Sequence, residues 1–102
     1  MILSKNPSTI KDTRYILIEV TLYFSHGNRK ITALLNYKAD KNLISQHFTK
    51  ENSLKATPVR RIRIIVDKRH VIIYGSYNII TKVKDFRNEV RVTQRTFYAI
   101  DI

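Results

Sequence analysis

Cysteine is absent from the 102 residues, so the chain can form no disulfide and no cysteine-based metal site. A secreted domain held together by disulfides is thereby excluded, and residence inside the cell, in the cytoplasm or nucleus, is the simpler expectation. No apolar run approaches the roughly 20 residues with which a helix crosses a bilayer. The apolar stretch at the N-terminus is too short for a signal peptide. We therefore expect no membrane partner.

Glycine is scarce, since Gly27 and Gly75 are the two glycines of the whole sequence. Loops that cradle phosphate or a dinucleotide need several glycines so that the backbone can approach the ligand. Neither motif can be built here, and we expect no small-molecule cofactor. Histidines 26, 47 and 70 fall in turns or in a polar helix and lack the spacing of metal ligands. We expect them on the surface, and we expect no metal site.

Positive charge is what the chain has in excess. It carries 19 Lys and Arg against 8 Asp and Glu, which gives a formal net charge of +11 at pH 7. Such a charge favours solubility and attraction to polyanions, including nucleic acid, but it does not specify a fold. A chain of this length is expected to form one domain.

Alternating apolar residues predict a mostly β domain. The segment YILIEVTLYF, residues 15–24, alternates with a period of two and is rich in β-branched side chains, which indicates a strand. The segment SHGN predicts a turn, with Gly27 and Asn28 suited to positive φ, and residues 29–35 predict the partner strand of a hairpin. Residues 1–13 show little periodicity and are interpreted as an N-terminal arm or linker before a domain of residues 14–102.

The second half of the chain predicts two more hairpins. After Ser45, which is suited to cap a short helix, Pro58 favours an extended segment. Residues 59–77 then predict a hairpin around the turn DKRH, and residues 78–102 predict another around RNE. Three hairpins and one short helix indicate a small antiparallel β-barrel or sandwich.

One segment carries a family resemblance. ALLNYKADKNLIS, residues 33–45, follows the predicted first hairpin and precedes the helix. Together with the order of hairpins, it resembles the retropepsin-like aspartic protease domain of gypsy-class retrotransposon polyproteins. The residues that match the motif of that family are Ala33, Leu34, Leu35, Ala39, Asn42, Leu43, Ile44 and Ser45. The resemblance implies a retropepsin-type barrel over residues 14–102. The alternative is an ordinary strand, turn and helix whose apolar residues are core.

The diagnostic triplet of that family, Asp-Ser/Thr-Gly, is replaced here by Asn36, Tyr37 and Lys38. In the family, two such aspartates from two subunits share a proton and activate a water. An amide at Asn36 cannot accept that proton, Tyr37 cannot reproduce the short hydroxyl contact between subunits, and Lys38 lacks the freedom of glycine. Asp40 does not replace the lost carboxylate, because shifting the frame would lose the matches at Ala39, Asn42 and Ile44. The resemblance therefore implies a vestigial catalytic slot and a domain that is not an enzyme.

The resemblance also implies a flap and a dimer. The turn of the second hairpin lies where the family has its flap, over residues Asp67, Lys68, Arg69 and His70. The family forms homodimers through its active-site loops, its flaps and its chain ends. The apolar ends, Met1–Leu3 and Ile100–Ile102, are then candidates for pairing between subunits.

The basic residues support a second hypothesis. Three pairs of cations each share one face of a predicted strand, and on neighbouring strands they would form a positive stripe: Arg61 and Arg63, Lys82 and Lys84, Arg91 and Arg95. Nearby aromatic residues would offer stacking surfaces for bases: Tyr74, Tyr77, Phe97 and Tyr98. The alternative is a solvated polar face with the aromatic rings in the core.

The sequence therefore leads to three hypotheses about function. The first is an inactive retropepsin-like domain that serves as a self-association or protein-interaction module. The second is a basic nucleic-acid-binding module. The third, which the substitutions at the slot disfavour, is an active homodimeric aspartic endopeptidase.

Overall fold

The structure is a computed structural model that describes residues 1–3, 15–36, 41–58, 63–66, 69–84 and 87–102. Within these ranges the chain is mostly β with one short helix, as predicted. The elements in chain order are β1 (Ile2–Leu3), β2 (Tyr15–Phe24), β3 (Gly27–Asn36), β4 (Asn42–Ser45), α1 (Gln46–Glu51), β5 (Arg63–Val66), β6 (Arg69–Ile72), β7 (Gly75–Lys84) and β8 (Val90–Ile100).

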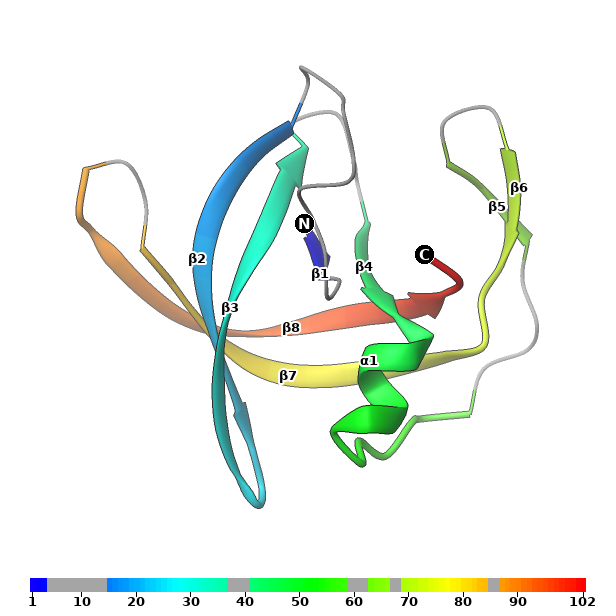
Figure 1. Ribbon diagram of the computed structural model, residues 1–102, viewed down its shortest axis with the longest axis horizontal. Helices are drawn as coiled ribbons and strands as arrows, with labels where there is room; N and C mark the ends of the chain where they lie inside the picture. Colours follow the sequence, from blue (N-terminus) through cyan, green and yellow to red (C-terminus); the bar gives the residue numbers. More distant parts are fainter. Residues whose placement is uncertain (4–14, 37–40, 59–62, 67–68, 85–86) are drawn as a thin grey trace.

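Strands of the N- and C-terminal halves close into one barrel in the order β1-β3-β2-β7-β8-β4 (Figure 1). The long strands β3, β2, β7 and β8 pair with one another in antiparallel fashion, whereas β4 lies parallel to both of its neighbours, β1 and β8. The short strand β1 completes the ring, because Ile2 pairs with Leu34 of β3 on one side and with Leu43 of β4 on the other. The prediction of a small β-barrel is confirmed.

The first hairpin forms where the alternation of residues 15–24 predicts it. Val20 and Leu22 point into the barrel and are fully buried, while Leu17 and Tyr23 on the other face are exposed. Phe24 pairs with Gly27, so the turn consists of Ser25 and His26. Gly27 has a φ of +149°, which side chains rarely tolerate, so a glycine is required there. The other residue suited to positive φ, Asn28, lies instead in β3 opposite Tyr23.

The short helix is also where the sequence predicts it, but the strand before it was missed. Ser45 caps α1 by accepting a hydrogen bond at Oγ from the backbone N–H of Phe48, at 3.3 Å. Strand β4 does not alternate, because both of its faces are covered. Ile44 belongs to the cluster inside the barrel and Leu43 to a second cluster outside it.

The second and third predicted hairpins are present with a shifted boundary. β5 and β6 pair as a separate two-stranded sheet that ends at Ile72, so the prediction that this hairpin extends to residue 77 is wrong. Gly75 instead begins β7, whose long pairing with β8 is the third hairpin. A Cβ on Gly75 would lie 3.0 Å from Cβ of Ala56, so this glycine allows the strand to approach the segment after α1. Thr57 and Ser76 exchange backbone hydrogen bonds there.

Two clusters make up the core. The cluster inside the barrel contains Met1, Leu3, Val20, Leu22, Ala33, Ile44, Phe48, Ile79, Phe97 and Ala99. The cluster outside it contains Ile2, Leu34, Leu43, Ile73 and Ile100. The first three residues of the predicted arm therefore lie within the barrel, with alternate side chains in the two clusters. Residues 4–13 of that arm fall outside the described residues.

Candidate functional site

The predicted vestigial slot begins at the last residue of β3. Asn36 is the last residue of this strand and pairs with Tyr15 of β2, whereas Tyr37 and Lys38 lie outside the described residues. The slot segment joins β3 to β4, and these two strands flank β1 on either side. Of the three predicted slot residues, Asn36 is therefore the one that the structure places, at the end of β3 and beside β2.

The residues on either side of these three positions belong to the barrel strands and contribute to its hydrophobic core. Ala33 is fully buried, Leu34, Leu43 and Ile44 are at most 4% exposed, and Ser45 is the helix cap. Packing alone thus accounts for these residue types. The order of the elements around these residues is therefore a better indicator of family than the residue types themselves.

Acidic groups in the described part of the chain lie on other elements. Glu19 of β2 forms an ion pair with Lys30 of β3, and Glu51 of α1 pairs with His47 at 2.8 Å. Asp101 accepts a hydrogen bond from the hydroxyl of Tyr74 at 3.0 Å, and Glu89 precedes β8. Over the described ranges, no group of three or more His, Cys, Asp or Glu residues is placed to hold a metal ion. Histidines 26, 47 and 70 are exposed, as predicted.

The predicted flap falls on the β5–β6 hairpin. Arg69 and His70 begin β6, and the side chain of His70 is exposed. Asp67 and Lys68 fall in a gap between the described ranges. Figure 1 shows this hairpin standing apart from the barrel, on the side where β7 begins.

The basic residues do not form the single stripe predicted from the sequence. β7 and β8 are neighbours, but Lys82 faces Val92 and Lys84 faces Val90 on the outside of the barrel. Arg91 faces Val83, and Arg95 faces Ile79, on the opposite side of the ribbon. Directly paired residues share a face, so the two lysines and the two arginines point in opposite directions. Arg63 belongs to the separate sheet of β5, and Arg61 is outside the described residues.

The aromatic residues are divided between core and surface. Phe97 is fully buried and Tyr77 packs against the interior cluster, so neither offers a free stacking surface. Tyr74 is 40% exposed, and Tyr98 is half-buried beneath the ammonium group of Lys41, which lies 5.2 Å from the ring centroid. For Phe97 and Tyr77 the core alternative is therefore confirmed.

Arg95 has a structural role that the sequence analysis missed. Its Nε donates to Oγ1 of Thr81 at 3.0 Å, and that fully buried hydroxyl donates to the carbonyl of Thr93 at 3.2 Å. Burial, and after it the nearby Arg95 charge, lowers the pKa of the Met1 amino group below its ordinary value of 8.0. Arg95 lies two residues before the buried Phe97, and this alternation is the signal that could have placed it on the inner face.

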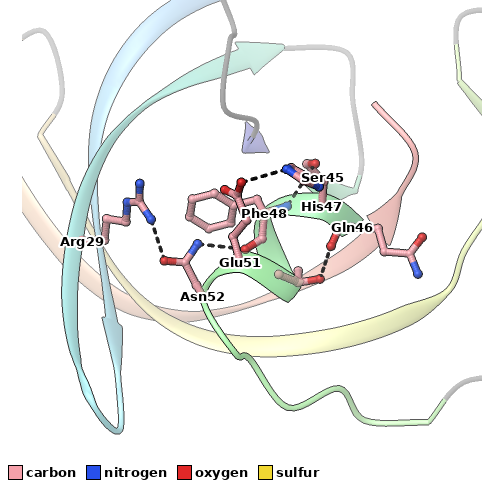
Figure 2. A network of polar contacts seen from close by, with 8 residues as sticks. Arg29, Ser45, Gln46, His47, Phe48, Glu51 and Asn52 are labelled. Atoms are coloured by element: carbon pink, nitrogen blue, oxygen red, sulfur yellow. Dashed lines mark hydrogen bonds and ion pairs between the residues drawn. The ribbon is translucent and has the colours of Figure 1, made fainter.

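A polar network fixes α1 against β3 (Figure 2). Nη1 of Arg29 donates to Oδ1 of Asn52 at 2.8 Å, and the guanidinium carbon lies 5.6 Å from the centroid of the Phe48 ring. Nδ2 of Asn52 in turn donates to the Phe48 carbonyl at 2.8 Å. These contacts join the end of the helix to the first hairpin, whose last residue is Asn36.

Comparison with protein-family models, curated proteins and solved structures found no match to this chain. Within the described residues, no helix has the length and apolar character needed to span a membrane.

Proposed function

We propose that this chain is a catalytically inactive retropepsin-like domain, derived from a retrotransposon polyprotein, that serves as a protein-interaction or self-association module inside the cell. The order of elements around the slot carries this proposal. The long hairpin β2–β3 ends at Asn36, β4 leads directly into α1, and the separate hairpin β5–β6 precedes the long hairpin β7–β8. This is the order that the resemblance implies. The absence of cysteine favours the intracellular setting.

The chemistry at the slot supports loss of catalysis. Peptide hydrolysis by this family needs a pair of carboxylates that can share and transfer a proton. Asn36 supplies an amide, and the four described acids, Glu19, Glu51, Glu89 and Asp101, belong to other parts of the molecule. A scaffold that keeps its barrel without these groups remains suited to binding.

Self-association has less support from the chain ends than the sequence suggests. Met1 and Ile2 are 6% exposed, Leu3 is fully buried and Ile100 is 1% exposed, all within one chain. Of the apolar ends, Ile102 remains available to a partner, at 53% exposure.

Size-exclusion chromatography with light scattering at high micromolar concentration tests the self-associating form of the proposal. We expect a dimer mass that falls to the monomer mass on dilution. A strict monomer at that concentration would contradict self-association. The remaining form of the proposal would then be binding to another protein.

A basic nucleic-acid-binding module is the second candidate, favoured by one observation. The outer face of β3, β2 and β7 exposes three lysines, Lys30, Lys82 and Lys84. Among the described residues, Glu19 is the acidic side chain on that face. Binding of single- and double-stranded oligonucleotides over a salt series tests it. Neutralised phosphates would give a steep loss of affinity with rising salt, and no binding at about 50 mM salt would remove this candidate.

A further inference from the structure

The first half of β8 has an edge that no other strand of the described residues pairs with. Residues Phe97–Ile100 of this strand pair with β4, whereas Val90–Arg95 pair with β7 on their one covered side. In the part of the chain that the structure describes, no strand lies along their other edge. On the other side of the β7–β8 hairpin, Ile80–Lys84 of β7 pair with β2, so β8 is the outer strand of this part of the sheet. The hairpin end, which we call the arm, consists of residues 79–84 and 90–95. It presents a row of backbone N–H and C=O groups of the kind that accepts an added strand.

The side chains along this edge do not block strand addition. Val90 and Val92 point outward and are 49% and 59% exposed. Arg91 and Thr93 point to the other face and are also exposed. Natural sheets protect an open edge with charged side chains, above all lysine, with proline or with a bulge. Over Val90–Arg95, β8 has no lysine or proline, and its two charges, Arg91 and Arg95, lie on the face opposite Val90 and Val92, where an acidic partner strand could pair with Arg91.

Charge on the arm indicates what kind of strand it would accept. Lys82 lies directly beside Val92, and Lys84 directly beside Val90, on the outer face. Arg91 adds an exposed cation on the other face, and the sequence of residues 79–95 contains two acids, Asp85 and Glu89. A second copy of the chain would bring another net charge of +11 to this surface. An acidic segment is therefore the complementary occupant.

We propose that the free edge of β8 over Val90–Arg95 binds an extended acidic peptide of a partner protein as an added β-strand. The peptide alternates. Aliphatic residues lie beside Val90 and Val92 on the outer face, and Asp or Glu lies beside Arg91 on the other face. Backbone hydrogen bonds supply affinity, and the alternation supplies selectivity. This inference rests on the arm alone and holds whether or not the domain derives from a retropepsin.

Fluorescence anisotropy with a labelled peptide of about seven alternating Val and Glu residues tests the inference. We expect saturable binding to the full chain. Binding is expected to disappear with the alternating Val and Lys peptide, with a scrambled peptide of the same composition, and with a peptide N-methylated on the edge that would face β8. Loss with the N-methylated peptide separates strand addition from simple charge attraction.

Two variants test the site on the protein. Arg91→Glu and Val92→Lys change exposed side chains, and each is expected to weaken binding about tenfold or more. Lys55→Glu is the matched control, because it makes the same change in net charge as Arg91→Glu at an exposed position away from the arm. We expect this control to retain the affinity of the parent chain. Circular dichroism checks that each variant keeps its β structure.

Amide hydrogen exchange provides the second readout. Bound peptide is expected to slow exchange at alternate residues of Val90–Arg95. Several results would overturn the inference: no saturable binding, an equal effect of Arg91→Glu and Lys55→Glu, unchanged exchange at this edge, or preferential binding of an oligonucleotide there. A dimer abolished by Val92→Lys would place a second copy on the edge and would overturn it as well.

Discussion

Ser53 is held in the left-handed region of backbone conformation, with a φ of 53°. It follows the end of α1, where its N–H donates to the carbonyl of Lys50 at 3.2 Å and the N–H of Leu54 donates to that of Thr49 at 3.0 Å. These two bonds form a Schellman motif, and the half-buried Leu54 packs against the interior cluster. A left-handed conformation favours glycine, so a serine at this position adds backbone strain.

Replacing Ser53 with glycine is therefore expected to stabilise the fold. The gain in the free energy of unfolding should be about 0.5–1 kcal/mol, because relief of the left-handed strain exceeds the entropy cost of glycine. Urea denaturation measures it. Ser53→Ala is the control, because it removes the hydroxyl but keeps Cβ, and it should leave stability nearly unchanged. A gain in the alanine variant equal to that in the glycine variant would contradict the explanation.

Thr81 places a hydroxyl group in the interior, where it needs hydrogen-bond partners. Its buried hydroxyl accepts from Arg95 and donates to the Thr93 carbonyl. Thr81→Val keeps the shape but removes both hydrogen bonds, and it should lower the free energy of unfolding by about 1–3 kcal/mol. Thermal and urea denaturation measure the loss. In a double-mutant cycle with Arg95→Met, we expect the two losses to be non-additive, whereas simple additivity would show that the pair is not coupled.

Strand β1 illustrates how much an element can matter beyond its length. It has two residues, yet it lies between β3 and β4 and completes the ring. Its position buries the amino group of Met1 near Arg95, which lowers the pKa of that group in the folded chain. Unfolding exposes the amino group and returns its pKa to an ordinary value near 8.

Stability of the 102-residue chain with a free amino group should therefore depend on pH. Between the lowered pKa and about 8, the unfolded chain binds more protons than the folded chain, so the free energy of unfolding rises with pH and levels above that range. Urea denaturation at a series of pH values measures this rise. Acetylation of the amino group removes the titration and should flatten the curve, and an identical rise in the acetylated chain would contradict this assignment.

Strands were predictable from the sequence where one face of the strand is buried and the other is exposed to solvent. The alternation of residues 15–24 gave the correct bounds of β2, because Val20 and Leu22 face the interior while Leu17 and Tyr23 face solvent. β4 was missed because its buried residues alternate between two clusters and so show no polar face. The faces of the basic residues were missed because they depend on the register of β7 with β8, which local periodicity does not fix.

At the scale of the whole molecule, the barrel pairs segments that are distant in the chain, and local sequence patterns do not predict these pairings. The two ends of the chain meet through β4, which pairs with β1 on one side and with β8 on the other. Of the apolar ends that the sequence offers to a partner, Met1–Leu3 and Ile100 are thereby buried in the same chain, whereas Ile102 stays exposed. Such long-range closure follows from the order of strands, whereas the proposed slot at Asn36 rests on a local motif.

The proposed loss of catalysis at Asn36 predicts the behaviour of restored variants. Asn36→Asp alone should not produce peptidase activity, because Tyr37 and Lys38 still lack the short hydroxyl contact and the glycine of the family. Asn36→Gln serves as the matched control without a carboxylate. Turnover by Asn36→Asp above that of Asn36→Gln would show that one residue accounts for the loss.

A peptide-cleavage assay on the unmodified chain, with and without a statine-type inhibitor, tests the central claim most directly. The chain is assayed at high micromolar concentration beside an active retropepsin that verifies the substrate. The inactive domain proposed here predicts no turnover at any acidic or neutral pH, because an amide at Asn36 cannot share and transfer a proton as paired carboxylates do. Cleavage by the unmodified chain that the inhibitor abolishes would contradict it.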